Sequence, residues 1–411
     1  MSKLDELINK LCPDGVQFLK IGDVFDVVTD YTAAGSFADI AKNVKYKNEE
    51  DYALLLRTTD IKSNFEKGKF IYIDEHAYEY LWRVHLDKES LILPNIGNCG
   101  EIYYLTPDMI PYKRAALAPN AILVRSSSTN MRYLFHVLQT KKYLDQLAKI
   151  TSPVGQTKFN KTEFKALKIP VPPMDVQREI VRILDSFTEL TAELTAELTA
   201  REQQYNFYRD KIIGSIECLE VKLNEIAEIY DGTHQTPEYK TEGIPFISVE
   251  NINNIYSSKK YVSAAAFEKY KIKPQIDDVF MTRIGSIGKC AVMTKSCDLA
   301  YYVSLALIRP NISRILPEYL KYYIESMYGK IELAKRTLTH AVPIKINKDE
   351  IGKITIKLPT IEKQKEIVCL LSRFDDITNS IVMGLPAEIE ARQKQYEYYR
   401  DKLLTFKELK A

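Results

Sequence analysis

The chain has 411 residues, of which 45% are hydrophobic and 27% charged, and 57 Lys and Arg nearly balance 55 Asp and Glu. This length favours two or three domains with cores of their own. The apolar fraction, with only 15 Gly and 17 Pro, excludes a disordered or collagen-like chain. The net charge of +2 does not by itself indicate a polyanionic partner, because acidic surface elsewhere can cancel a basic face.

The cysteine and histidine positions argue against a metal or disulfide framework. No C-x-x-C pair occurs, and the histidines show no metal-ligand spacing, so we predict reduced thiols. The N-terminal residues lack a signal-peptide layout, and no apolar run approaches the ~18 residues of a membrane span. We therefore expect a soluble, cytoplasmic protein. The scattered cysteines are Cys12, Cys99, Cys218, Cys290, Cys297 and Cys369.

The first globular segment, residues 1–170, has mixed α and β character. Residues 70–74 and 121–128 have the apolar, β-branched composition of strands. Residues 133–150 have the spacing of a helix.

A long helix is predicted next, within a segment of residues 171–213. From Asp175 to Ile213, apolar residues such as Val176, Ile180 and Leu184 follow one another at spacings of three and four. Residues 190–200, LTAELTAELTA, form a tandem four-residue repeat that places a Leu at every fourth position. Each TAEL unit adds ~6 Å to a helix, so the repeat suits a spacer of adjustable length, although an ordinary amphipathic helix has the same composition.

The second half of the chain repeats this order. Residues 214–354 are again mixed, with strands predicted at 246–249 and 305–310 and a helix at 318–336. Residues 355–411 form a second helical segment, in which we expect a break near Gly384 and Pro386 because proline suits only the first turn of a helix. Two long apolar stripes are best buried by packing the helices on each other.

Internal sequence similarity supports a duplication. VPPMDVQREIVRILDSF at residues 171–187 matches LPTIEKQKEIVCLLSRF at 358–374, and AREQQYNFYRDKII at 200–213 matches ARQKQYEYYRDKLL at 391–404. Weaker matches follow the same order: LKIGDVFDV with VKLNEIAEI, NIGNCG with RIGSIG, and KFNKTEF with KINKDEI. The sequence thus predicts an α+β chain with a pseudo-twofold repeat of globular domain and helix.

Motifs for catalysis on DNA are not found. The phosphate-binding pattern G-x-x-x-x-G-K-[ST] has no match, since Cys290 follows Lys289 in IGSIGKC. Methyltransferase motifs are missing, and Pro107-Asp108 pairs with Glu163-x-Lys165 only across a gap too long for a typical metal nuclease. We therefore expect a protein that is not catalytic by itself.

Polar loops that carry hydroxyl, amide and basic groups recur at matching places in both halves. Such donors position phosphates and read base edges, although an ordinary polar loop has the same composition. The candidate DNA-binding residues are Arg57, Thr58, Thr59, Lys62, Arg125, Ser127, Asn130, Gln156, Lys158, Thr233, His234, Gln235, Thr236, Lys240, Asn251, Arg283, Ser286 and Lys289.

The repeated segments resemble the specificity subunit of type I restriction-modification enzymes. The similarity lies in the paired P-x-x-x-x-Q-x-E-I-V segments, in residues 203–213 and 385–406, in TRIGSIGK at 282–289, and in the TAEL repeat found in one subgroup. The resemblance implies two similar mixed α/β target-recognition domains, residues 1–170 and 214–354, separated by two long antiparallel helices within the helical spacers 171–213 and 355–411.

The resemblance also implies partners. They are double-stranded DNA, two modification subunits that methylate adenine with S-adenosylmethionine, and restriction subunits that use ATP and Mg for translocation and cleavage. No cofactor is implied for this chain. Each domain would read one half of an asymmetric duplex site, and the helices would set the spacing of the halves.

Two other hypotheses remain open from the sequence alone. One is a coiled-coil scaffold without nucleic-acid function, and the other is an enzyme whose site is not recognised. Sequence-selective duplex binding would separate the first hypothesis from the scaffold, and activity of the isolated chain would support the enzyme.

Overall fold

The computed structural model describes residues 2–66, 69–152 and 157–409. The chain forms two compact units: unit 1 comprises Met1–Leu194 and Glu388–Ala411, and unit 2 comprises Thr195–Ala387. Each unit contains one globular domain and one part of each long helix, α9 (Met174–Gly214) and α14 (Ile361–Leu403). Segments at opposite ends of the chain therefore belong to one unit.

Unit 1 contains three small sheets. Their orders are β2-β8-β5-β6, β4-β3-β7 and β1-β9. The strands are β1 (Gln17–Lys20), β2 (Val27–Asp30), β3 (Ala53–Leu56), β4 (Tyr72–Ile73), β5 (Ser90–Pro94), β6 (Tyr103–Leu105), β7 (Ala115–Leu117), β8 (Ala121–Arg125) and β9 (Lys168–Val171).

Unit 2 has the same sheets in the same order: β11-β17-β14-β15, β13-β12-β16 and β10-β18. A parallel pairing recurs as well, β3 with β7 in unit 1 and β12 with β16 in unit 2. The predicted duplication is therefore confirmed at the level of strand order. The strands are β10 (Leu219–Lys222), β11 (Ala227–Asp231), β12 (Ile244–Ile247), β13 (Tyr261–Val262), β14 (Val279–Thr282), β15 (Cys290–Val292), β16 (Ala300–Tyr301), β17 (Leu305–Pro310) and β18 (Thr355–Leu358).

The shorter helices cover these sheets. Unit 1 contains α1 (Lys3–Leu11), α2 (Ile21–Val24), α3 (Phe37–Asn43), α4 (Thr58–Lys62), α5 (Glu75–Tyr80), α6 (Met131–Val137), α7 (Lys141–Ile150) and α8 (Lys161–Ala166). Unit 2 contains α10 (Ala264–Phe267), α11 (Pro317–Glu325), α12 (Met327–Ala334) and α13 (Lys348–Gly352).

Each helix predicted inside a globular domain is in fact a pair of helices. The prediction of one helix at 133–150 is wrong because Thr140 caps a new helix by accepting the N–H of Tyr143 at 3.3 Å. At the matching place in unit 2, Ser326 accepts the N–H of Gly329 at 3.3 Å and separates α11 from α12. Apolar spacing continues across both breaks, which is why the sequence pattern alone did not reveal them.

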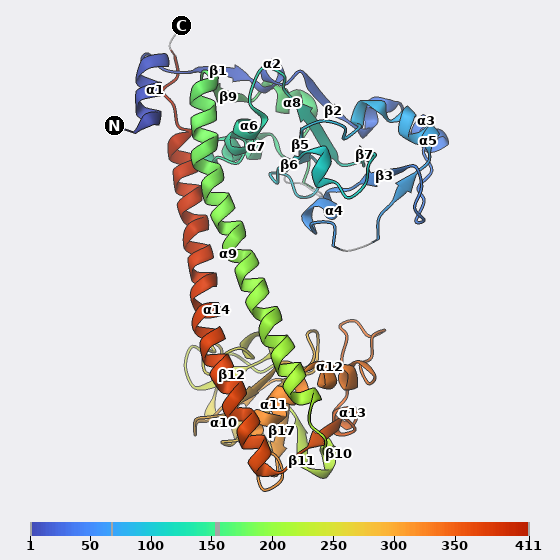
Figure 1. The fold of residues 1–411 in the computed structure, drawn as a ribbon, viewed down its shortest axis with the longest axis vertical. Helices are drawn as coiled ribbons and strands as arrows, with labels where there is room; N and C mark the ends of the chain where they lie inside the picture. The colour runs from blue at the N-terminus through green and yellow to red at the C-terminus, as the bar shows by residue number, and fades with distance from the viewer. Residues whose placement is uncertain (1, 67–68, 153–156, 410–411) are drawn as a thin grey trace. The chain divides into compact units, whose positions relative to one another are not determined.

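The long helix α9 runs without interruption through the TAEL repeat (Figure 1). Within unit 1, Phe187 of α9 stacks on Tyr399 of α14 with ring centroids 5.4 Å apart. Within unit 2, Tyr208 of α9 stacks on Phe374 of α14 at 5.7 Å. The start of one helix thus meets the end of the other in both units, so the two helices are antiparallel.

The expected break in the second helix is not present, because α14 continues through Pro386. A proline inside a helix costs about 3 kcal/mol, since it removes one backbone hydrogen bond and crowds the preceding turn. Burial of Ile367, Leu371 and Tyr396 on either side of the proline offsets this cost.

The repeated P-x-x-x-x-Q motif has the same structural role in both units. Gln177 donates to the carbonyl of Pro172 at 2.8 Å and accepts the N–H of Asn130 at 3.0 Å. Gln364 donates to the carbonyl of Pro359 at 2.9 Å and accepts the N–H of Leu316 at 2.8 Å. In both units, this pair of contacts joins the start of the long helix to the helix that follows β8 or β17.

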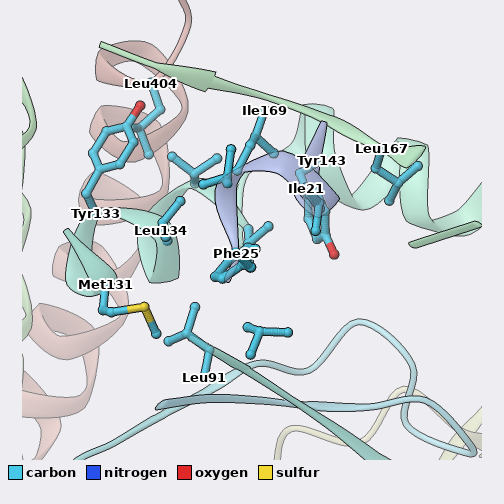
Figure 2. Packing of buried hydrophobic residues seen from close by; sticks show 14 of the residues in the cluster. Ile21, Phe25, Leu91, Met131, Tyr133, Leu134, Tyr143, Leu167, Ile169 and Leu404 are labelled. Atoms are coloured by element: carbon cyan, nitrogen blue, oxygen red, sulfur yellow. The ribbon is translucent and has the colours of Figure 1, made fainter. Parts of the chain in front are cut away.

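The main core of unit 1 lies between the sheets, α6, α7 and the long helices. Figure 2 shows Ile21, Phe25, Leu91, Tyr133 and Leu404 in this cluster, drawn from segments far apart in the sequence. A second cluster fills the other side of the four-stranded sheet, and unit 2 contains the corresponding clusters. Each unit therefore has apolar cores of its own.

Candidate nucleic-acid interface

Three of the predicted loops meet at one end of the sheets in unit 2. They follow β11, β12 and β14 and contain DGTHQTP, SVEN and RIGSIGK. The register places the ends of β11 and β14 beside the start of β17, where Asp231 pairs with Ala306 and Thr282 with Leu305. The parallel partner of β12 also ends here, because Tyr302 donates its N–H to the carbonyl of Ile247 at 2.9 Å.

Arg283 holds these loops together from a buried position. Its side chain is 8% exposed, forms an ion pair with Asp231 of the DGTHQTP loop, and donates to the carbonyl of Ile346 at 3.1 Å. Burial lowers the pKa of Arg283, but the paired carboxylate compensates for the loss of water. The Arg283 side chain thus stabilises the fold through internal contacts and is not available to a ligand.

The glycine loops of both units share an unusual backbone. Gly97 and Gly285 have φ values of 87° and 78°, in the left-handed region that favours glycine. Gly97 donates its N–H to the carbonyl of Thr157 at 2.8 Å, and Gly285 donates to the carbonyl of Ile344 at 2.9 Å. The loose match of NIGNCG with RIGSIG is therefore a match in conformation as well.

A cavity of about 680 Å³ opens beside the DGTHQTP loop. One wall contains Thr233, Gln235, Thr236 and Lys240 from the predicted set, and the other wall comes from residues 262–272. The Thr233 hydroxyl donates to the carbonyl of Gln235 at 3.3 Å, and Lys240 pairs with Glu238 at 2.5 Å. His234 lies on the outer surface of the loop, 72% exposed and 4.0 Å from Asp231.

Three lysines that were not among the predicted residues also line the cavity. Lys269, Lys271 and Lys348 line it with exposed side chains, and within the described residues they form no ion pair. Tyr270 also lines the cavity; its hydroxyl is buried without a hydrogen-bond partner among the described residues, and burial raises its pKa to about 12. A polyanion such as a nucleic-acid backbone suits this combination of free ammonium groups and hydroxyl donors.

The other predicted residues of unit 2 lie on the neighbouring loops. Ser286 and Lys289 are exposed on the glycine loop. Asn251 is half-buried, and its carbonyl oxygen accepts the N–H of Ser248 at 3.1 Å. Asn251 therefore shapes its loop, whereas Ser286 and Lys289 are available to a ligand.

In unit 1, the loops after β3 and β5 occupy the equivalent end of the sheets. Thr58 is half-buried and Thr59 exposed on α4, and Lys62 forms an ion pair with Glu101 of the glycine loop. Lys158 is exposed, and its backbone bridges to Ile96 of the same loop. The structure thus brings Lys62 and Lys158 to one glycine loop.

Arg57 is largely occupied by internal contacts. Its guanidinium donates to both oxygens of the buried Asp60, at 2.6 and 2.9 Å, and to the carbonyl of Lys69 at 2.8 Å. The side chain is 37% exposed, and the ion pair with Asp60 raises the pKa of Arg57. Its first role is to fix the loop that presents Thr59.

Arg125, Ser127 and Asn130 lie at the opposite end of the four-stranded sheet. Arg125 pairs in register with Val27, at the start of β2, and donates to the carbonyl of His85 at 2.6 Å. Asn130 caps α6 by accepting the N–H of Tyr133 at 2.9 Å, and Ser127 is exposed beside Asp26. The prediction grouped these residues with the other loops, but the antiparallel strand order separates them. Gln156 lies outside the described residues.

A further basic loop in unit 2 escaped the sequence analysis. The backbone of Lys345 bridges to Ile284 of the glycine loop, as Lys158 bridges to Ile96 in unit 1. The match between KFNKTEF and KINKDEI could have identified Lys345, because it aligns this residue with Lys158. Lys348 lies in the same matched segment, where it aligns with Lys161. Lys269 and Lys271 had no such signal, since their segment meets this loop only in the folded unit.

The described residues contain no group of three or more His, Cys, Asp or Glu side chains that could hold a metal ion. The arrangement that remains is a pair of diverged domains, each with polar loops at one end of its sheets and each attached to two antiparallel helices. Such an arrangement is typical of a protein that recognises its target with two separate domains.

Comparison with known proteins identifies the class. The type I restriction modification DNA specificity domain matches residues 13–201 and 217–391. The chain is 30% identical over 299 residues to a putative type I restriction enzyme specificity subunit of Haemophilus influenzae, covering 67% of this chain and 72% of that protein. It is 35% identical over 271 residues to the EcoR124I/EcoR124II specificity subunit of Escherichia coli, covering 60% of this chain and 65% of that protein.

A solved structure has the same fold. It concerns complex assembly and conformational transition of the type I R-M system, and its matching chain has a TM-score of 0.58 and 18% identity over 96% of this chain and 98% of its own. The protein belongs to the family of type I restriction-modification specificity subunits. It is a non-catalytic DNA-recognition subunit, and the family gives no support to the scaffold or enzyme hypotheses.

Across residues 2–66, 69–152 and 157–409, no helix combines the length and the apolar character needed to cross a bilayer.

Proposed function

We propose that each globular domain reads one half of an asymmetric bipartite duplex site, and that α9 and α14 set the distance between the halves and dock two adenine-methyltransferase subunits. The observation that carries this proposal is the repeated placement of polar loops after β2, β3 and β5 and after β11, β12 and β14. A pseudo-twofold pair of readers matches the pseudo-twofold symmetry of duplex DNA.

The divergence of the loops supports an asymmetric target. After β2 the chain forms a short 3₁₀ helix at Tyr31–Ala34 and then α3, whereas after β11 it forms the open DGTHQTP loop beside the basic cavity. Loops of such different shape present different donors to the DNA. The two half-sites should therefore differ in sequence.

The partners and cofactors follow from the same proposal. S-adenosylmethionine binds to the modification subunits, ATP and Mg bind to the restriction subunits, and this chain supplies DNA recognition in the cytoplasm. The interface residues we propose from the predicted set are Thr59, Lys62, Lys158, Thr233, His234, Gln235, Thr236, Lys240, Ser286 and Lys289.

The test is a map of methylated adenines in cells that express the chain with its modification subunits. Changing Gln235→Ala together with Thr236→Ala should relax one or two base positions in one half-site by roughly 10- to 100-fold, because each good base contact contributes ~1–3 kcal/mol. The other half-site and the spacing should stay unchanged.

Ser313→Ala provides the matched control. Ser313 is an exposed hydroxyl residue of the same unit, in the turn after β17, away from the loop end of the sheets. The control should leave the methylated motif intact. A change in both half-sites, or an unchanged motif in the loop variant, would contradict the assignment of this loop to one half.

A further inference from the structure

The two units differ at the base of their long helices, where only unit 1 has a covering helix. This helix, α1, begins with a capping box in which Ser2 and Asp5 bond to each other's backbone N–H. Leu4 is 3% exposed, and Leu7 and Ile8 are half-buried in the same cluster as Val176 and Ile180 of α9. The apolar face of α1 thus covers the first turns of α9.

An ion pair fixes α1 in place. Lys3 donates to Glu179 at 2.8 Å, and the Glu179 side chain is only 4% exposed, although that of Lys3 is 70% exposed. Arg182 approaches the same carboxylate at 2.7 Å. Glu179 is therefore a buried acceptor that suits a cation from the first turn of a docked helix.

Strand register defines the equivalent place in unit 2. Gln17 pairs with Val171 in β1 and β9, and Leu219 pairs with Leu358 in β10 and β18. The two Gln residues described above make the same contacts in both units. With this alignment, Glu366 corresponds to Glu179, and Leu370 corresponds to Ile183.

This equivalent place in unit 2 is an open groove of about 780 Å³. It is lined by Ile212, Ile216, Leu219, Ile367 and Leu370, and Glu366 lies on its edge. Leu219 is 78% exposed and Leu370 44% exposed. Glu366 is 67% exposed, against 4% for Glu179. Lys363, which stands in place of Val176, also lines the groove and pairs with Glu366 at 2.8 Å, as Arg182 pairs with Glu179 in unit 1. The groove thus has an apolar floor and a carboxylate at the place of the α1 site, and no described helix of unit 2 covers it.

We propose that this groove is a docking site for an amphipathic helix of a protein partner. Its occupant carries aliphatic residues with the spacing of Leu4, Leu7 and Ile8, and a Lys or Arg one position before the first of them. The basic residue pairs with Glu366 as Lys3 pairs with Glu179. The proposal rests on the comparison of the two units and not on the proposed DNA function.

The equivalent site in unit 1 is occupied by α1, which indicates that a helix is the ligand that fits the groove in unit 2. In unit 1 the positions covered on α9 are Val176, Glu179, Ile180 and Ile183, which follow one face of a helix over two turns. On the matching face of α14, Lys363, Glu366 and Leu370 are exposed and Ile367 is buried at the floor of the groove. A helix laid across this face buries aliphatic side chains, as in other cases of helix-in-groove recognition. Its basic residue adds a second cation to the Glu366 carboxylate, which already pairs with Lys363.

A peptide with the sequence of residues 2–15 is the probe. Labelled with a fluorophore and titrated with the full chain, it should bind saturably, with a Kd of about 0.1 mM because short isolated helices are marginal in water. Leu370→Asp in the chain should weaken binding about tenfold or more, since the exposed leucine becomes a desolvated charge. Ile312→Asp, at a 58% exposed site of unit 2 outside the groove, should not weaken it.

A charge exchange makes the test specific for position. Glu366→Lys should weaken binding several-fold, and a Lys3→Glu change in the peptide should restore it on that variant alone. No saturable binding, insensitivity to Leu370→Asp, or failure of the charge exchange would overturn the proposal. Loss of binding with Glu179→Lys but not with Glu366→Lys would also overturn it, because the peptide would then be displacing α1 in unit 1.

Discussion

Three lysines line the cavity beside the DGTHQTP loop and have no carboxylate partner within the described residues. Lys269, Lys271 and Lys348 come from the segments around α10 and α13, so only the folded unit brings them together. Free ammonium groups around a hydroxyl-rich loop are typical of phosphate positioning and not of base readout. Their expected contribution is affinity that is independent of sequence.

Replacing the three lysines with Ala should weaken duplex binding uniformly across sequences. The slope of log K against log salt should fall by about 0.9 for each lysine that contacts a phosphate, because fewer counterions are released. Lys330→Ala, at an exposed position of α12, should leave the slope unchanged. A change in the methylated motif with an unchanged salt slope would show that these lysines read bases.

Glu179 allows a test of pH dependence. The side-chain bonds from Arg182 and Lys3 hold the pKa of Glu179 at about 2, below its ordinary value of about 4.5. A carboxylate with a depressed pKa stabilises the fold above the unfolded pKa and loses that contribution as the pH falls through the folded pKa.

Glu179→Gln should therefore lower the free energy of unfolding by roughly 1–2 kcal/mol at pH 7, a value reduced because both cations are largely exposed. The difference from the parent should shrink between about pH 4.5 and pH 2. Urea unfolding at several pH values measures it. Glu366→Gln should have little effect on the free energy of unfolding at pH 7, because Glu366 is 67% exposed, and equal effects of the two changes would contradict the burial difference.

At the residue scale, sequence patterns select residue types but do not reveal which contacts each side chain makes inside the folded unit. Arg283 and Arg57 were reasonable candidates for base readout, yet each guanidinium is held by a carboxylate of its own unit. The sequence does not show the partner of Arg283, because Asp231 lies far from it along the chain, whereas Asp60 is close to Arg57 in sequence and only the folded loop shows that the two side chains meet. Exposed Ser286 and Lys289, by contrast, match the expectation for a loop residue.

At the scale of elements, the long helices were predictable and their interruptions were not. The predicted helix from Asp175 to Ile213 agrees with α9 to within one residue at each end, because its apolar stripe is continuous. The break at Pro386 was wrong because packing on both sides outweighs a local penalty. The breaks at Thr140 and Ser326 were missed because capping residues are common in helices of ordinary composition.

The TAEL repeat allows a test of the helix as a spacer. Residues 190–200 are exposed or half-buried along α9, with Leu194 and Leu198 among the half-buried ones. Deleting Thr195–Leu198 should shorten α9 by ~6 Å and turn its ends by roughly 40° relative to each other. This shift is under two base-pair rises of ~3.4 Å, so the spacing of the methylated half-sites should change by one or two base pairs.

Methylation mapping measures the spacing directly. Thr195→Ala keeps the length of α9 and should keep the parent spacing. Both half-sites should stay unaltered in the deletion variant, and a variant with altered half-sites would argue against the spacer role.

At the scale of the whole molecule, the duplication includes individual hydrogen bonds and backbone angles. Strand order, the glutamine contacts at the helix starts and the positive φ of the glycine loops recur in both units. The units differ mainly in their loops and in α1. Those differences give the protein two distinct recognition surfaces on one architecture and leave one groove open.

The sequence by itself determined the duplication, the two long helices and the kinship with specificity subunits. These follow from residues that recur in the same order and from apolar spacing, both of which are local along the chain. Only the tertiary structure decided which loops share an end of the sheets, which arginines are free and which groove is open. Those properties depend on pairing between strands such as β2 and β8, which are distant in sequence, and local patterns carry no record of that pairing.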